Sequence, residues 1–401
     1  MLKRLTLAAI LMIIGLMLSG IAGAQSERLQ IVASFSILAD VVRNVAGDAA
    51  DVTSLMPIGV DPHSFSPSPQ DIVAVAEADV VFMNGINFEE LLMEAIENAG
   101  GEPNLVVVSE CINILPISEG HDHEDEAAPA ATEDAEAAET TVELRADIDP
   151  AVAAQCEAHT AALVAMHEGR ESAEHQEDDD HAEGEKHAHG EPLGALYTLE
   201  CGHHEEEEAA GEETEGEEHG ACDPHVWTDP HNVIFWTYAI RDTLVALDPA
   251  NAQNYTANAA AYAADLDTYA HEIVGVMLRT VPEANRILVT NHETLGYLAA
   301  NYGYEVVGVV LPGGSTGAEP SAADVATLID LIKAEGALAV FAENTVSANI
   351  ATQVAAESGA KFYTLLSDSL TDATGPGATY LDYIRHNAEV IAVALGGNRI
   401  Q

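Results

Sequence analysis

Residues 28–56 read RLQIVASFSILADVVRNVAGDAADVTSLM, and this stretch decides the class of fold. Its apolar residues predict a β-strand at 28–35, a helix at 37–45 and a second strand at 52–56. A strand, a helix and a strand within about thirty residues indicate one βα unit, because two parallel strands need a crossover connection between them. The start of the chain therefore predicts a parallel sheet.

The same alternation continues after residue 56 and returns near the C-terminus. Ser68-Pro69 opens a helix that ends near residue 76, and the segments that follow are a strand at 80–84, a helix at 89–99 and a strand at 105–109. A second set of apolar strands covers 286–290, 305–310, 338–342 and 362–366, with helices at 322–334, 350–358 and 380–395. We predict an α/β fold of two lobes, each with a four-stranded, mainly parallel sheet flanked by helices.

A long helical segment separates the two sets of strands. It begins at Asp248-Pro249 and continues to about residue 280, so it is ~45 Å long as a single helix. Because that length exceeds one domain, we predict one rigid helix linking the lobes. The predicted plan is a signal peptide at 1–24, an N-terminal lobe at 25–116 and 222–247, an insert at 117–221, the linking helix at 248–280 and a C-terminal lobe at 281–401.

The N-terminus has the pattern of a secretory signal. Lys3-Arg4 precedes an apolar run over 5–21, and Ala22-Gly23-Ala24 provides a cleavage site of small residues. We expect export and cleavage after Ala24. The alternative is a retained membrane anchor, although the run is short for a span of ~30 Å. No cysteine lies near the junction, which predicts no lipid anchor. The expected location is the periplasm or the outer face of the cytoplasmic membrane.

The chain is extremely acidic. It has 67 acidic and 14 basic residues, and its formal net charge is −53. Such a surface excludes nucleic acids and anionic membranes as partners, because both are bound through basic patches. It favours cations. The alternative explanation of the charge is solubility or a salty habitat.

Residues 117–221 form an insert unlike the rest of the chain. They hold 33 of the 67 acidic residues and 11 of the 17 histidines, and we predict a largely disordered tract that collects metal ions weakly. The exceptions are 149–169, where apolar residues have helical spacing, and 193–199, which predicts a short strand or turn. The alternative is a solvated acidic linker. The predicted secondary metal ligands are His121, His123, His187, His189, His203 and His204.

Four cysteines can form disulfides in an exported protein. Cys156 and Cys201 lie inside the insert, and Cys111 and Cys222 lie at its two edges. A nested arrangement, Cys156 with Cys201 and Cys111 with Cys222, would close the insert at its base. The alternative is that two of the thiols are free.

Four residues predict a metal site. His63 lies just past the second strand, His225 precedes a helix, His292 follows a strand directly, and Asp368 follows another after one serine. In open α/β sheets, ligands bind outside the carboxyl ends of the strands. Three imidazoles and one carboxylate, two from each lobe, make a tetrahedral set for Zn²⁺. Singly, each has an ordinary alternative: a loop histidine, or a helix N-cap for Asp368.

The tripeptide Asp-Pro-His occurs at 61–63, 223–225 and 229–231. Proline fixes φ and restricts the residue before it, so the following side chain is aimed in one direction. In the third copy Asp229-Pro230 reads as the cap and first residue of a helix. We therefore expect His231 to face solvent.

The chain resembles the metal-binding solute-binding proteins of ABC transporters, the TroA-like zinc and manganese receptors. The resemblance covers 28–116 and 222–397, and the stretches that carry it are GVDPHSFSPSPQD, DPHVWTDPHN, LDPANAQNYTANAAAY, TNHETLGYLAANYG, AEPSAAD and LLSDSL. It implies two lobes that clamp one divalent metal and a rigid helix that limits their closure. It also implies that the ligands are His63, His225, His292 and Asp368.

The resemblance implies a partner and a cargo. The partner is a membrane permease with a cytoplasmic ATPase, and the receptor is expected to be a monomer. His292 stands where manganese-type members have a glutamate. Because imidazole suits Zn²⁺ and harder Mn²⁺ prefers oxygen, we expect zinc, with manganese as the less favoured cargo. A His-rich insert is likewise typical of the zinc members.

Three other functions are alternatives. The first is a manganese receptor of the same family. The second is a secreted zinc buffer or a cell-adhesion protein that works without a transporter. The third is a zinc hydrolase, for which Glu293 is the obvious general base. An enzyme is the least favoured reading, because catalytic zinc keeps an open coordination position and the predicted shell has four protein ligands.

Overall fold

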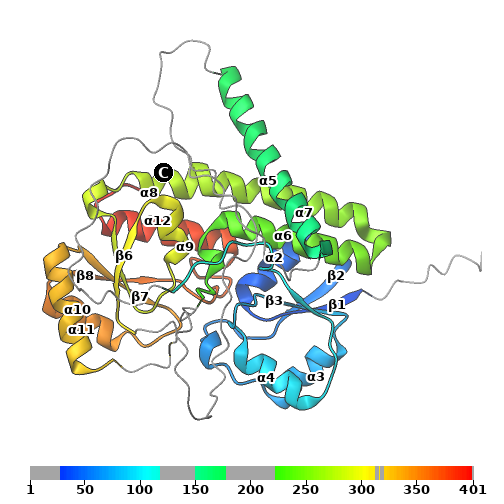
Figure 1. Cartoon of the computed structure of the whole chain (residues 1–401), viewed down its shortest axis with the longest axis horizontal. Helices are drawn as coiled ribbons and strands as arrows, with labels where there is room; N and C mark the ends of the chain where they lie inside the picture. The colour runs from blue at the N-terminus through cyan, green and yellow to red at the C-terminus, as the bar shows by residue number, and fades with distance from the viewer. Residues whose placement is uncertain (1–27, 118–149, 178–221, 312–315, 317–319, 400–401) are drawn as a thin grey trace, which may run out of the picture.

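The computed structural model describes residues 28–117, 150–177, 222–311, 316 and 320–399. Two parallel four-stranded sheets lie side by side below a layer of helices (Figure 1). The predicted signal peptide, the six predicted insert ligands and the short element at 193–199 lie outside the described residues. The predicted disorder of the insert falls mainly on 118–149 and 178–221, which are also outside them. Within the described ranges, no helix is both long enough and apolar enough to cross a membrane.

The N-terminal sheet has the strand order β2-β1-β3-β4. Its strands are β1 (Leu29–Ala33), β2 (Ala50–Ser54), β3 (Val80–Met83) and β4 (Leu105–Val107). One face packs against α3 (Pro69–Glu77) and α4 (Glu90–Ala99), and the other packs against α2 (Ser36–Ala46). Both faces are covered, so the central strand β3 is an unbroken apolar run, whereas the edge strand β2 has alternating burial.

The C-terminal sheet repeats this order as β6-β5-β7-β8. Its strands are β5 (Ile287–Thr290), β6 (Glu305–Val309), β7 (Ala339–Glu343) and β8 (Lys361–Leu365). The helices of this lobe are α9 (Gly296–Tyr302), α10 (Ala322–Glu335), α11 (Asn349–Ser358) and α12 (Tyr380–Ala394). The predicted fold class is confirmed: the chain has two parallel four-stranded sheets flanked by helices.

The helical layer joins the lobes. It contains α6 (Pro230–Leu247), α7 (Ala252–Thr268) and α8 (Gly275–Arg279), and α7 with α8 extends across both sheets (Figure 1). The run from Pro249 to Arg279 is helical throughout, as the sequence predicts, but it is not one α-helix. It begins with a 3₁₀ turn, and a π-helical segment, Tyr269–Val274, separates α7 from α8. Apolar periodicity does not reveal such a segment.

The lobes share one hydrophobic core. Trp227, just before α6, packs against Phe35 and Phe88 of the N-terminal lobe, with ring centroids 4.9 Å apart in both pairs. Its indole N–H donates to the carbonyl of Ser367 (3.1 Å), and the hydroxyl of Tyr380 donates to its carbonyl (2.7 Å). The buried indole therefore holds both lobes at once.

Part of the insert folds onto this layer as α5 (Pro150–Glu177). Helical spacing at 149–169 predicted a helix there, and the helix is present. Leu163 is buried, and the ring of His159, also buried, pairs with Asp242 of α6 through Nε2 (2.8 Å). Its apolar side therefore belongs to the core of the protein.

The nested disulfide arrangement is wrong. Cys111 is bonded to Cys156, with Cα atoms 5.1 Å apart. The docking of α5 brings Cys156 to the edge of the N-terminal lobe, and sequence spacing does not show this packing. Cys222 is disulfide-bonded as well, and Cys201 lies outside the described residues. The chain closes across the base of the insert through an antiparallel bridge between Pro116 and Cys222.

The disulfide should hold α5 in place. We expect the double variant Cys111→Ser/Cys156→Ser to release α5 while both sheets stay folded, because the bond closes a loop of 45 residues and such a closure contributes about 4 kcal/mol. Hydrogen exchange followed by mass spectrometry should show faster exchange in 150–167 and unchanged protection in β1 and β7. Unchanged protection of α5 would contradict this role.

Candidate metal centre

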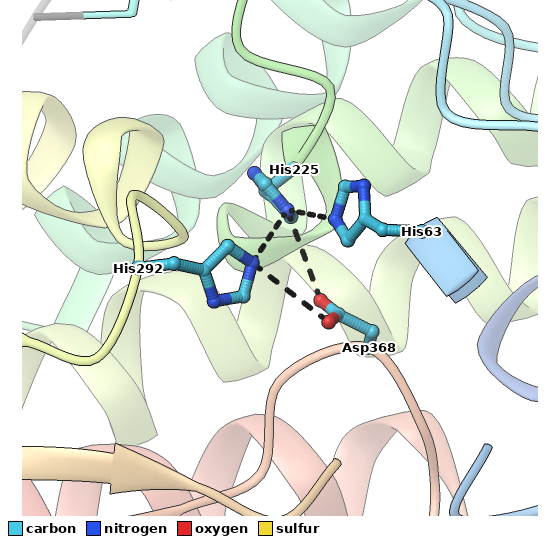
Figure 2. A group of neighbouring side chains, drawn as sticks. All are labelled: His63, His225, His292 and Asp368. Atoms are coloured by element: carbon cyan, nitrogen blue, oxygen red, sulfur yellow. Dashed lines mark hydrogen bonds and ion pairs between the residues drawn. The ribbon is translucent and has the colours of Figure 1, made fainter. Parts of the chain in front are cut away.

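The four predicted residues converge between the lobes (Figure 2). His63 lies in the 3₁₀ turn Pro62–Ser64, where the Asp61 carboxylate accepts a hydrogen bond from its backbone N–H (3.0 Å). His225 precedes the 3₁₀ turn Val226–Thr228. His292 follows β5, and Asp368 follows β8. Two side chains come from segments before α7 and two from segments after α8, so both lobes contribute to the centre.

The donor atoms have the spacing of a coordination shell. His225 Nε2 lies 3.2 Å from His63 Nε2 and 3.3 Å from His292 Nε2. The two oxygens of Asp368 lie 3.9 Å from His225 Nε2 and 3.9 Å from His292 Nε2. Ligands bound tetrahedrally at 2.0–2.2 Å are separated by about 3.3–3.6 Å. The four donor atoms therefore lie close to the positions that one small ion requires.

Carboxylates behind two of the histidines fix how the rings are oriented. Asp223 Oδ1 lies 2.7 Å from His225 Nδ1 and accepts from the backbone N–H of the same residue (2.9 Å). Glu343, the last residue of β7, contacts His292 Nδ1 (2.5 Å) and accepts from its backbone N–H (3.0 Å). A carboxylate at Nδ1 leaves Nε2 for a metal and strengthens its donor character. Sequence reasoning gave neither carboxylate a role.

The centre is buried, and its electrostatics reflect this. Burial, with the neighbouring histidines, lowers the pKa of His63 to about 3 and that of His225 well below its usual value. Burial also lowers the pKa of His292, but the Glu343 carboxylate outweighs this effect and raises it to about 9. Burial raises the pKa of Asp368 to about 7. Such perturbed groups in one buried cluster are typical of a functional site.

One buried carboxylate oxygen of the cluster has no hydrogen-bond donor, and a cation could satisfy it. Asp368 Oδ1 has no hydrogen-bond partner, although the side chain is fully buried. An orphaned carboxylate oxygen in the interior costs free energy unless a cation or a donor satisfies it. The residues present therefore fit a divalent cation at the point between them.

The histidine of the third Asp-Pro-His copy, His231, is less exposed than the sequence predicts. The side chain of His231 is 14% exposed, and its Nε2 lies 3.2 Å from His271 Nε2. The expectation that His231 faces solvent is wrong, because α5 and the π-helical segment cover the first turn of α6. Glu293, the predicted general base, is not one of the four converging residues.

Comparison with known proteins identifies the family. The family model described as "Zinc-uptake complex component A periplasmic" matches residues 31–394. The chain belongs to this family. Its members are substrate-binding proteins of ABC transporters and not enzymes, which confirms the resemblance seen in the sequence.

Individual relatives differ in the metal that their names give. The chain is 28% identical to the manganese-binding lipoprotein MntA of Halalkalibacterium halodurans, over 98% of this chain and 99% of the relative. It is 26% identical to the iron-binding protein YfeA of Yersinia pestis, over 92% of this chain and 88% of the relative. Both matches span most of each protein, so the two lobes and the segments between them are shared.

Solved structures share the fold. The periplasmic zinc-binding protein TroA of Treponema pallidum superposes with a TM-score of 0.61 at 22% identity, covering 92% of this chain and 99% of that one. A manganese-bound periplasmic metal-binding protein of Candidatus Liberibacter asiaticus gives a TM-score of 0.60 at 22% identity, covering 91% and 98%. At this identity the likeness supports the architecture alone.

The Glu343 carboxylate provides a test of the centre. For an ion held by the four side chains, we expect Glu343→Gln to raise the dissociation constant about 10- to 100-fold, because removing an outer carboxylate typically has that effect. Isothermal titration of metal-free protein with Zn²⁺ measures the change. Glu335→Gln, at the exposed end of α10, is the matched control. Equal affinities in the two variants would show that Glu343 does not support the site.

Proposed function

We propose that this protein binds Zn²⁺ between its lobes through His63, His225, His292 and Asp368, and delivers the ion to an ABC-type importer. The observation that carries the proposal is the set of three imidazole nitrogens and one carboxylate oxygen within 4.8 Å of one another. Four protein donors complete a tetrahedral shell, which suits capture of an ion more than catalysis on it.

The donor set favours zinc over manganese. Three nitrogens and one oxygen match the preference of Zn²⁺ for imidazole, whereas Mn²⁺ prefers carboxylates, carbonyls and water. The names of the relatives give manganese, iron and zinc, so they leave the choice to the chemistry of this site. His292 carries that choice, because a carboxylate in its place would make the set half oxygen.

Delivery requires a location outside the cytoplasm and a membrane partner. The family description names a periplasmic component of an uptake complex, and the apolar N-terminal run with its small-residue junction predicts export. We propose a location in the periplasm or on the outer face of the cytoplasmic membrane. The partner is a permease with a cytoplasmic ATPase.

Titration of the metal-free protein tests the site. We expect stoichiometric, tight binding of one Zn²⁺ between the lobes, and we expect His63→Ala to lose it, because three donors remain and solvent must complete the shell. His386→Ala, which removes a histidine on α12 that is not one of the four converging residues, should bind as the unchanged chain does. Full tight affinity in His63→Ala would overturn the assignment.

A substitution at His292 tests whether this residue sets the preference for Zn²⁺ over Mn²⁺. In His292→Glu we expect the affinity for Zn²⁺ to fall more than the affinity for Mn²⁺, so that their ratio drops at least roughly tenfold as nitrogen is exchanged for oxygen. Competition titrations with both ions give the ratio directly. A ratio equal to that of the unchanged protein would show that His292 does not set the choice of metal.

The growth of a strain without this protein distinguishes zinc import from zinc buffering or adhesion. A strain that lacks the protein should grow poorly in chelated medium, and added Zn²⁺ should restore its growth. A buffer or adhesin that works without a transporter predicts normal growth under the same chelation.

A further inference from the structure

A second cluster of metal-ligating side chains lies in the helical layer and shares no residue with the first. It consists of His167 of α5, His231 in the first turn of α6, Asp267 near the end of α7 and His271 in the π-helical segment. Figure 1 shows α5 lying across α6 and α7. Three parts of the chain that are distant in sequence thus bring three imidazoles and one carboxylate together, the same donor set as at the first centre.

The imidazole rings are spaced as at the first centre, and the carboxylate oxygen lies closer to its two histidines than Asp368 does there. His231 Nε2 lies 3.2 Å from His271 Nε2, Asp267 Oδ1 lies 2.9 Å from His167 Nε2, and Asp267 Oδ1 lies 3.3 Å from His271 Nε2. The three imidazole centroids are 5.0, 5.2 and 5.7 Å apart. At the first centre the corresponding values are 5.0, 5.4 and 5.5 Å. One small ion fits either arrangement.

Two of the buried donor atoms lack hydrogen bonds. His167 Nε2 and Asp267 Oδ1 take part in none, although they lie 2.9 Å apart. The Asp267 side chain is 6% exposed. Together with His231 Nε2 and a donor nitrogen of His271, these two atoms lie within 4.8 Å of one another, which is a spacing that the ligands of one shared ion can have.

The outer partner of His231 repeats that of His225. Asp229 Oδ1 lies 2.8 Å from His231 Nδ1 and accepts from the His231 backbone N–H (3.0 Å). Asn301 donates to the same oxygen (3.0 Å). The equivalent distances in the Asp223–His225 pair are 2.7 and 2.9 Å. In the copies at 223–225 and 229–231, the aspartate therefore holds Nδ1 of its own histidine, and Nε2 lies in a cluster of donors.

The backbone is irregular at this place. Asp267 and His271 are four residues apart, and the π-helical segment Tyr269–Val274 begins between them. π-Helical turns are rare and occur frequently at functional sites. Arg170 of α5 also approaches Asp267, with its Nε 3.6 Å from Oδ2. This contact engages the second carboxylate oxygen and leaves Oδ1 directed at the histidines.

We propose that His167, His231, Asp267 and His271 form a second site for a divalent transition-metal ion of the zinc class. His167 comes from the insert and the other three ligands come from the linking layer, so bound metal fastens α5 to α6 and to the π-helical segment. The Cys111–Cys156 disulfide holds the first part of α5, and the ion holds the helix about three turns later, at His167. The site is independent of the proposed transport site.

Stoichiometry tests the second site. Titration of metal-free, full-length protein with Zn²⁺ should show two tight equivalents besides any weak binding. His63→Ala should lose one of them and His167→Ala the other, and His386→Ala should lose neither. His167 is 19% exposed, so its replacement should leave the unfolding temperature of the metal-free protein unchanged. A single tight equivalent, or a second one that survives both His167→Ala and His271→Ala, would overturn the proposal.

Two further measurements locate the ion. Zinc should slow hydrogen exchange around residues 160–170 in the unchanged protein and in His63→Ala, but not in His167→Ala. Anomalous diffraction from zinc-loaded crystals should place an ion about 2.0–2.2 Å from the four donor atoms. An ion bound elsewhere on α5, or exchange in α5 that zinc does not slow, would contradict the proposal and leave the transport site untouched.

Discussion

The rest of the structure depends on a buried charge imbalance between the lobes. Asp223, Glu343 and Asp368 are all nearly inaccessible to water, and each lies beside His225 or His292. Removing a carboxylate from water costs several kcal/mol unless charges and hydrogen bonds compensate it. A divalent cation bound as we propose would supply that compensation. Side chains from both lobes meet at this point, and the shared core around Trp227 packs the two lobes against each other beside it.

The same local contact between an aspartate and a histidine occurs in two Asp-Pro-His tripeptides. In Asp223-Pro224-His225 and in Asp229-Pro230-His231, the aspartate binds both the backbone N–H and Nδ1 of the histidine two residues later. Proline restricts the backbone between them, so a local contact within the tripeptide helps to orient the ring. Only five residues lie between the two histidines, yet one is directed between the lobes and the other towards α5. The short segment between them, which includes Trp227, thus connects the buried centre to the helical layer.

Much of the fold could be predicted from the sequence, because strands buried on both faces are apolar runs and parallel strands alternate with helices. The converging residues could be predicted as well, since the carboxyl ends of parallel strands meet on one side of a sheet. The features that could not be predicted depend on tertiary packing. Glu343 ends a strand like many other carboxylates, and only the register of β7 beside β5 brings it to His292. The pairing of Cys111 with Cys156 and the burial of His231 both follow from the docking of α5. Helix-cap chemistry at Asp229 gives no information about which segment covers the first turn of α6.

The four side chains of the first centre differ in their exposure to solvent. At the first centre, His225, His292 and Asp368 are fully buried, and His63 alone among the four retains partial exposure. His63 also lies on a short 3₁₀ turn, whose Asp61 carboxylate accepts a hydrogen bond from the Thr316 hydroxyl (2.6 Å) of the opposite lobe. Of the four side chains at the proposed transport site, His63 is therefore the one that solvent reaches, and it lies on a turn that contacts the opposite lobe through Asp61.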